Sequence, residues 1–143
     1  MIPENPKIVA LIPAFDEEKT IGDVVRGALK YVDHVVVVDV LSEDDTVDVA
    51  REAGAQVIRL RKRRKVGGVV KAGISYVKNL DLNILGILDA DGQHDLDEIP
   101  HLLNLVLNGK FDLVQGSRFL EDKRKEPLKM LETAFSADWS AFY

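Results

Sequence analysis

Short apolar runs alternate along this chain with segments in which apolar residues recur every three or four positions. The runs show little polar alternation, which is typical of strands buried on both faces of a parallel sheet. The five expected strands are Ile8–Ile12, Val35–Val38, Val57–Leu60, Ile84–Leu88 and Phe111–Val114.

The intervening segments have helical spacing. From Ile21 to Val32, apolar residues fall at i, i+3, i+4, i+7, i+8 and i+11, which predicts one apolar stripe on a helix. Shorter stripes predict helices over 47–53, 70–77 and 99–106, with glycines near two of their ends. The alternating order of strands and helices predicts an α/β fold, a three-layer α/β/α sandwich around a mostly parallel central sheet.

The last segment departs from this alternation. A charge run over 121–126 precedes Pro127, and apolar residues then recur at helical spacing from Leu128 to Phe142. We therefore expect a domain over 1–120 and an amphipathic helical tail over 121–143. Two interpretations of the tail stay open: a packed core helix, or an exposed face for a homodimer partner or a membrane surface.

Composition narrows the class of protein. A length of 143 residues is typical of one domain, and the absence of cysteine excludes disulfide scaffolds, thiolate zinc sites and cysteine nucleophiles. The net charge of −5 argues against general nucleic-acid binding. Neither a membrane-spanning apolar stretch nor a secretory leader is recognisable, so we expect a cytoplasmic protein, with peripheral contact at the cytoplasmic membrane face as an open alternative.

Polar residues follow the predicted strands, at the sheet edge where ligands bind in open α/β folds. Asp89 and Asp91 have the i, i+2 spacing that points two side chains the same way in extended backbone. With Gln93 they offer oxygen ligands for Mg²⁺. The alternative is a polar turn in which Asp91-Gly92 makes the bend, and the spacing alone favours neither interpretation.

Two further features have a structural and a functional interpretation. The basic run from Arg59 to Lys65 is a solvated loop, or it neutralises a diphosphate or an anionic lipid head group. Asp39, which ends an apolar strand, is a turn cap or accepts hydrogen bonds from a nucleobase or ribose. A solitary histidine such as His94, beside the Asp89 element, favours a solvent-facing or outer role.

Three motifs, in the expected order, resemble those of family 2 glycosyltransferases, which have the GT-A fold. Residues 12–21, IPAFDEEKTI, are similar to the family opening I-P-A-Y-N-E-E-x-x-I. Residues 88–94, LDADGQH, followed by Ile99-Pro100, match the dolichyl- or polyprenyl-phosphate hexose (mannose or glucose) synthase branch. Residues 114–119, VQGSRF, are similar to the V-x-G-S-R-[FY] of that branch, and the resemblance covers residues 7 to about 120.

The resemblance implies a metal-dependent, inverting transfer of a hexose from a nucleotide-diphosphate sugar, of the GDP-mannose or UDP-glucose type, to a polyprenyl or dolichyl phosphate. The residues implied at the nucleotide are Pro13, Ala14, Phe15, Glu17, Asp39, Lys65, Asp89 and Ala90. Those implied at Mg²⁺ or Mn²⁺ are Asp89, Asp91 and Gln93. The implied catalytic residues are Asp91 and Arg118, with the arginine at a phosphate of donor or acceptor.

The chain departs from the family pattern in three places. After the second strand the family has D-D-G-S, whereas Val40 and Leu41 follow Asp39 here. Val66 stands where the family has the lysine of G-K-G, although Arg64 and Lys65 are adjacent. Family members also continue beyond this length. The alternative function is therefore a non-catalytic or truncated nucleotide-sugar-binding module.

Overall fold

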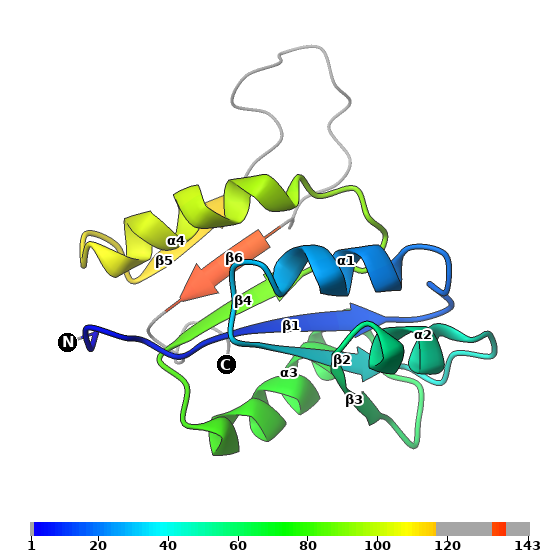
Figure 1. Ribbon diagram of the computed structural model, residues 1–143. Helices are drawn as coiled ribbons and strands as arrows, with labels where there is room; N and C mark the ends of the chain where they lie inside the picture. Colours follow the sequence, from blue (N-terminus) through cyan, green and yellow to red (C-terminus); the bar gives the residue numbers. More distant parts are fainter. Residues whose placement is uncertain (1, 117–132, 137–143) are drawn as a thin grey trace, which may run out of the picture.

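The structure, a computed structural model, describes residues 2–116 and 133–136 as a twisted six-stranded sheet with helices on both faces (Figure 1). The strand order is β3-β2-β1-β4-β6-β5. β1, β2, β3 and β4 pair in parallel, and β6 runs antiparallel to β4 and β5. The strands are β1 (Ile8–Ala14), β2 (His34–Asp39), β3 (Gln56–Arg59), β4 (Ile84–Leu88), β5 (Leu113–Gly116) and β6 (Thr133–Ser136).

Helices cover the two faces of the sheet unequally. The described helices are α1 (Ile21–Ala28), α2 (Thr46–Glu52), α3 (Val66–Val77) and α4 (Ile99–Leu107), with short 3-10 turns at Lys78–Leu80 and Leu96–Glu98. Residues of α1, α2 and α4 share one core with the sheet, and α3 packs on the opposite face (Figure 1). The predicted α/β/α sandwich is confirmed. Among the described residues, no helix is long and apolar enough to cross a membrane.

The two cores follow from the alternation of side chains along β1. Ala10, Ile12 and Ala14 face the larger core with α1, α2 and α4, while Val9 and Leu11 face α3. All five side chains are buried. A strand between two helical layers needs apolar residues on both faces, which is why β1 shows no polar alternation in the sequence.

Gly73 lets α3 approach the sheet closely. A Cβ atom at this position would lie 2.6 Å from Leu11 Cδ1 and 2.9 Å from Val38 Cγ2. Those separations are too short for carbon atoms in contact, so the α3 stripe predicted from the sequence includes a position where only glycine fits without repacking.

The tail differs from its expected form. Thr133–Ser136 is a strand in the interior of the sheet, with Phe135 aligned with Gly86 of β4 and Val114 of β5, whereas the spacing from Leu128 to Phe142 predicted a helix there. Strand pairing satisfies backbone groups along both neighbours, and a four-residue segment is too short for apolar spacing to distinguish helix from strand. Over residues 133–136 the expected helix is therefore wrong, and a dimer or membrane contact of the tail stays a prediction.

The remainder of the tail lies outside the described residues. Residues 117–132 and 137–143 are not described, and they include Arg118 and the expected boundary at residue 120. Both stay predictions.

Candidate nucleotide-binding site

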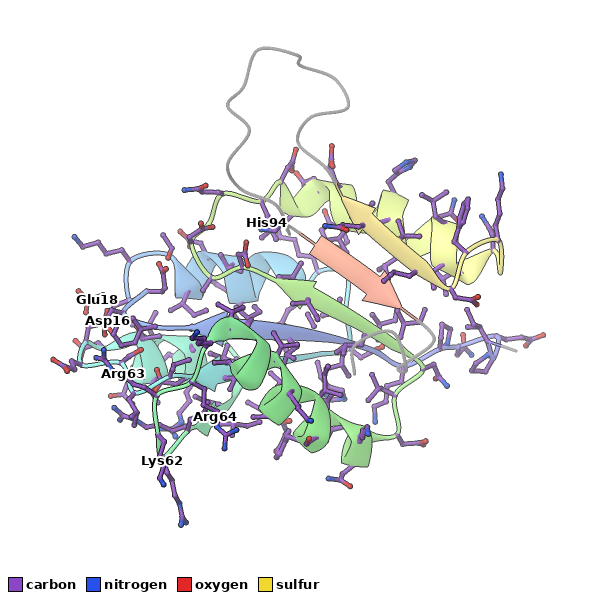
Figure 2. The ribbon with its side chains drawn as sticks, turned by 180° about the vertical axis from the view of Figure 1, so that it is seen from behind. Asp16, Glu18, Lys62, Arg63, Arg64 and His94 are labelled. Carbon is purple, nitrogen blue, oxygen red and sulfur yellow. The ribbon has the colours of Figure 1, made fainter. Side chains whose placement is uncertain are left out.

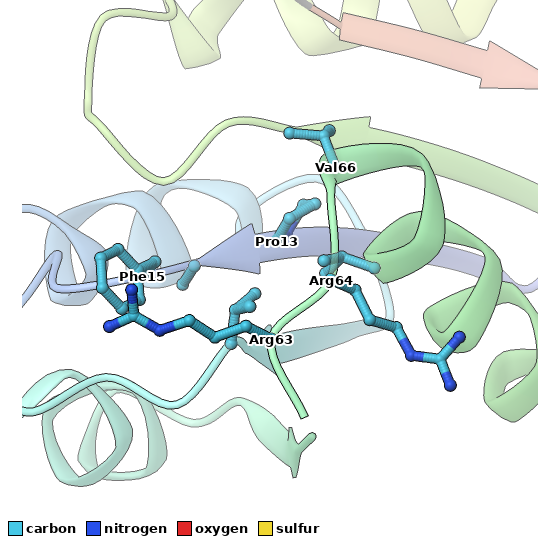
Figure 3. A pocket seen from close by; sticks show the side chains of 8 residues that line it. Pro13, Phe15, Arg63, Arg64 and Val66 are labelled. Carbon is cyan, nitrogen blue, oxygen red and sulfur yellow. The ribbon is translucent and has the colours of Figure 1, made fainter. Parts of the chain in front are cut away.

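A pocket of about 320 Å³ opens at the carboxyl edge of the sheet, beside the ends of β1 and β2 (Figure 3). Three residues expected at a nucleotide contribute to it: Pro13, Ala14 and Phe15. The complete lining is Pro13, Ala14, Phe15, Val40, Arg63, Arg64, Val66 and Val69. Its wall is therefore mainly apolar, with two arginines, which is a suitable surface for a flat ring attached to phosphates.

Phe15 and Arg63 form one side of this pocket. Phe15 is 40% exposed, and the guanidinium carbon of Arg63 lies 4.7 Å from the centre of its ring. Arg63 Nη2 also lies 3.8 Å from Glu43 Oε1. The Arg63 side chain reaches toward Phe15, while that of Arg64 extends in the other direction (Figure 3). The Arg63 guanidinium thus packs over the ring of Phe15.

The start of α3 forms another side of the pocket. Val66, its first residue, is 70% exposed. Lys65 is the N-cap, and its carbonyl accepts hydrogen bonds from the backbone N–H groups of Gly68 and Val69, but its side chain is not part of the lining. The first turn contains no acidic residue, so the positive end of the helix dipole is uncompensated by its own side chains.

The loops that follow β1 and β2 are joined by hydrogen bonds. The backbone N–H of Asp16 donates to Ser42 Oγ at 2.9 Å, and that of Glu17 donates to Thr46 Oγ1 at 2.7 Å. In the reverse direction, the N–H of Glu43 donates to Asp16 Oδ1 at 2.8 Å. These contacts fix the loop that carries Phe15. Glu17 therefore belongs to this bracing and does not line the pocket.

Asp44 is part of the same bracing. Its carboxylate accepts hydrogen bonds from the hydroxyl and backbone N–H of Thr46 and from the backbone N–H of Glu18. Desolvation acts to raise the pKa of Asp44, but these hydrogen bonds outweigh it and lower the pKa below its ordinary value. The charged form of Asp44 is thus favoured by the fold.

Asp39 is completely buried at the end of β2. Its Oδ2 lies 3.2 Å from Arg59 Nε, and its Oδ1 accepts a hydrogen bond from the Ser42 backbone N–H at 3.2 Å. Arg59 also donates to the Ser42 carbonyl oxygen at 2.6 Å. Direct contact between the Asp39 carboxylate and a nucleotide would require this cluster to open. The nucleotide role of Asp39 stays a prediction.

The end of β4 presents a different arrangement. The side chain of Asp89 is 48% exposed, and its Oδ2 lies 3.1 Å from Nε2 of His94, which is only 6% exposed. Ala90 is buried in the larger core. Asp91 Oδ1 accepts a hydrogen bond from the Gln93 backbone N–H at 3.0 Å, and Gly92 has a φ of +73°. The polar turn is therefore present, and it leaves both carboxylates partly accessible.

The donor set at this turn suits a hard divalent cation. Asp89, Asp91 and Gln93 would supply two carboxylates and an amide oxygen, which is the ligand chemistry of Mg²⁺ and Mn²⁺. Within residues 2–116 and 133–136, no three acidic, histidine or cysteine side chains cluster as a metal site. A cation here would thus depend on water or phosphate oxygens to complete its coordination.

Residues 9–141 match the sequence family described as Glycosyl transferase family 2. The chain belongs to this family. It is 31% identical over 127 residues to an uncharacterized protein of Methanocaldococcus jannaschii, covering 88% of the chain and 52% of that protein. It is 29% identical to the UDP-N-acetylglucosamine–dolichyl-phosphate N-acetylglucosaminyltransferase of Methanococcus voltae, over 81% of the chain and 53% of that protein. It is also 29% identical to the dolichol-phosphate mannosyltransferase of Pyrococcus furiosus, over 84% of the chain and 35% of that protein.

Solved structures agree on the fold of this family 2 chain. Glucosyl-3-phosphoglycerate synthase of Mycobacterium tuberculosis superposes with a TM-score of 0.71 at 24% identity, covering 93% of the chain and 58% of that protein. The GT-A fold is confirmed. The chain spans about half the length of the Methanocaldococcus jannaschii and Methanococcus voltae proteins, and about a third of the mannosyltransferase.

The family 2 motifs did not identify every residue of the pocket. Arg63 and Val69 line it although the motifs carry no role for them, and Val40 lines it where the family motif has an aspartate. Val69 shows only the apolar character of a helix that packs on a sheet. Arg63 had a signal in the sequence, since it belongs to the basic run, but six cations in that run look alike and only the loop conformation selects Arg63 and Arg64.

Proposed function

We propose that this family 2 domain binds a nucleotide-diphosphate sugar, of the GDP-mannose or UDP-glucose type, and transfers its hexose to a polyprenyl or dolichyl phosphate. The observation that supports this most directly is the placement of the pocket. Phe15 and Arg63 lie at the carboxyl edge of β1 and β3, and Asp89 and Asp91 follow β4 at the same edge.

The donor site divides into an apolar part and a charged part. Pro13, Ala14 and Phe15 offer a surface for the base, which would displace the Arg63 guanidinium from the ring of Phe15. Arg63 and Arg64, near the start of α3, supply positive charge for the diphosphate. Arg118, at a phosphate of donor or acceptor in the family pattern, completes the proposed set.

Asp89, Asp91 and Gln93 would hold Mg²⁺ or Mn²⁺ beside the diphosphate. A bound cation would neutralise the charge that develops on the nucleoside diphosphate as it leaves. Two solved structures of the Mycobacterium tuberculosis synthase are complexes with Mn²⁺ and UDP-glucose and with Mg²⁺ and UDP, which supports a metal in this fold. His94 contacts Asp89 and would fix the orientation of its carboxylate.

The proposed transfer inverts the configuration at the sugar carbon. An acceptor phosphate oxygen forms the new bond to C1 as the bond from C1 to the diphosphate oxygen breaks, and the electron pair leaves with the nucleoside diphosphate. A phosphate acceptor is anionic near neutral pH, so no side chain of the protein has to remove a proton. The names of the archaeal dolichyl-phosphate transferases support this acceptor class.

Calorimetric titration with GDP and with UDP, each with Mn²⁺ and with a chelator, tests the donor site. We expect one nucleotide to bind and the chelator to abolish most of that binding. Turnover with the sugars of that nucleotide and a polyprenyl phosphate then tests the transfer. Absence of binding by either nucleotide would contradict the proposed function.

A specific observation favours the second candidate, a binding module without turnover. Val66 faces the pocket where the family pattern has a lysine, so the position offers no charge to the diphosphate. If Arg63 and Arg64 do not replace that charge, Val66→Lys should tighten nucleotide binding by about tenfold, as expected for one charge-assisted contact. Unchanged affinity in Val66→Lys would show that the neighbouring cations already supply it.

A further inference from the structure

The loop between β3 and α3 carries an unusual concentration of positive charge. Residues 61–65 are five consecutive cations, and all five are exposed together with Val66 and Gly67. They account for five of the 19 basic residues, so the other 14 are opposed by 24 acidic residues, a net charge of −10 outside the loop. An anionic surface would therefore be attracted by this loop and repelled by most of the remaining protein.

The cations of this loop fall into two groups. Arg63 and Arg64 line the pocket, and Arg63 is also held by Phe15 and Glu43. Arg61, Lys62 and Lys65 do not line it, and among the described residues they have no acidic partner. Lys62 points away from the body of the protein (Figure 2). These three cations are thus available to bind an anionic partner outside the pocket.

Exposed apolar side chains accompany these cations at the pocket mouth. Val66 is 70% exposed and adjoins the basic run in the sequence, and Phe15, which lines the same pocket, is 40% exposed. Cations beside exposed apolar groups are the combination that binds the headgroup region of an anionic membrane. A purely solvated loop has no need of the apolar part, and a surface for nucleic acid would favour several aromatic residues among the cations.

We propose that the loop of residues 61–66 docks the mouth of the pocket on an anionic lipid surface, with Arg61, Lys62 and Lys65 toward the headgroups. This orientation would bring a membrane-embedded phosphate acceptor to the same edge of the sheet as the donor pocket. That benefit rests on the proposed function, whereas the docking itself depends only on the charge and exposure of the loop.

Sedimentation with lipid vesicles tests the proposal on the full chain. Vesicles of phosphatidylcholine with about 30% phosphatidylglycerol should bind the protein, pure phosphatidylcholine should not, and binding should weaken as ionic strength rises. Each cation near the surface contributes about fivefold to binding, so R61E/K62E should weaken it by more than about 25-fold. No binding to anionic vesicles at low salt would overturn the proposal.

A matched variant controls for net charge. K30E/K110E changes the charge by the same amount, but Lys30 follows α1 and Lys110 follows α4, at the opposite edge of the sheet. It should retain most of the vesicle binding, and an equal loss in both variants would overturn the proposed orientation. Nucleic acid is tested with a single-stranded oligonucleotide. If it binds as tightly as the anionic vesicles do, and R61E/K62E weakens its binding equally, a lipid-specific role would be overturned.

Calorimetry with nucleotide separates this inference from the proposed function. R61E/K62E should fold with an unchanged circular-dichroism spectrum and bind nucleotide with an affinity within about twofold of the unmodified protein, since neither residue lines the pocket. Vesicle binding without nucleotide binding would retain the docking surface and refute the donor site. Nucleotide binding without vesicle binding would retain the donor site and refute the docking surface.

Discussion

The ends of β2 and β4 carry aspartates that look equivalent in the sequence but differ in their surroundings. Asp39 ends β2 with its carboxylate fully buried between Arg59 and the backbone of Ser42. Asp89 follows β4 with its side chain about half exposed and in contact with His94. Both lie at the edge of the sheet where ligands bind in α/β folds.

This difference separates a carboxylate whose partners lie inside the protein from one that is accessible at the surface. The charge of Asp39 is already compensated by Arg59, and its oxygens accept hydrogen bonds inside the protein. Asp89 and Asp91 keep accessible oxygen atoms at a turn held by Gln93 and Gly92. An aspartate after a parallel strand is therefore insufficient evidence for a ligand site, because the accessibility of its carboxylate also has to be known.

The largest expected effect on stability follows from removing the buried member. Asp39→Ala leaves the Arg59 guanidinium and the Ser42 N–H without their partner, and because Arg59 is about half exposed, water recovers part of the loss. We expect the free energy of unfolding to fall by about 2 kcal/mol in urea denaturation. Asp23→Ala removes an exposed partner of Arg26 and should cost about 0.5 kcal/mol or less. Equal losses of unfolding free energy in the two variants would refute a special structural role for Asp39.

Removing a carboxylate from the turn after β4 should affect nucleotide binding more than folding. Asp91→Asn removes one carboxylate from the turn after β4, and we expect Mn²⁺-dependent nucleotide binding to weaken by about tenfold or more, as read by calorimetry. The free energy of unfolding should change by less than about 0.5 kcal/mol, because Asp91 is partly exposed. Asp81→Asn, an exposed carboxylate outside this turn, is the control. Comparable losses in folding and binding would restore a purely structural turn.

A smaller effect is expected in the loop after β2. Leu41 has a φ of +63°, a left-handed conformation that costs a residue with a Cβ atom about 1–2 kcal/mol. Leu41→Gly should therefore raise the free energy of unfolding by about 0.5–1 kcal/mol, after the greater entropy of glycine in the unfolded chain is subtracted.

Val40→Gly provides the comparison for that change. Val40 packs against the smaller core and lacks a positive φ, so glycine at this position should destabilise the protein. Stabilisation by both substitutions in thermal melting would refute backbone strain as the cause.

The smallest effect concerns pH. Hydrogen bonds lower the pKa of Asp44 in the folded protein, so the stability it contributes is present above its unfolded pKa of about 3.9 and is lost as pH falls through the folded value. Melting temperatures measured between about pH 2.5 and 6 should fall less steeply at the acid end in Asp44→Asn. Asp45→Asn, whose side chain is exposed, should follow the unmodified protein.

The sequence by itself determined the order of strands and helices from β1 to β5, but not the strand β6. Runs such as Ile8–Ile12 and Ile84–Leu88 are apolar because both faces of the sheet are covered, and that local pattern is visible without coordinates. The LDADGQH string also identified the turn after β4, since its residues are adjacent in the chain. What is local in sequence was predictable.

Only the tertiary structure decided which side chains are accessible and which strands become neighbours. Arg59 contacts Asp39 from the adjacent strand, and Arg63 contacts Phe15 from another loop. β6 inserts between β4 and β5 from the far end of the chain. Each depends on contacts between residues distant in sequence, and neither charge nor hydrophobic spacing within a segment specifies such partners. The same physical reason makes Asp39 internal and leaves Asp89 at the surface.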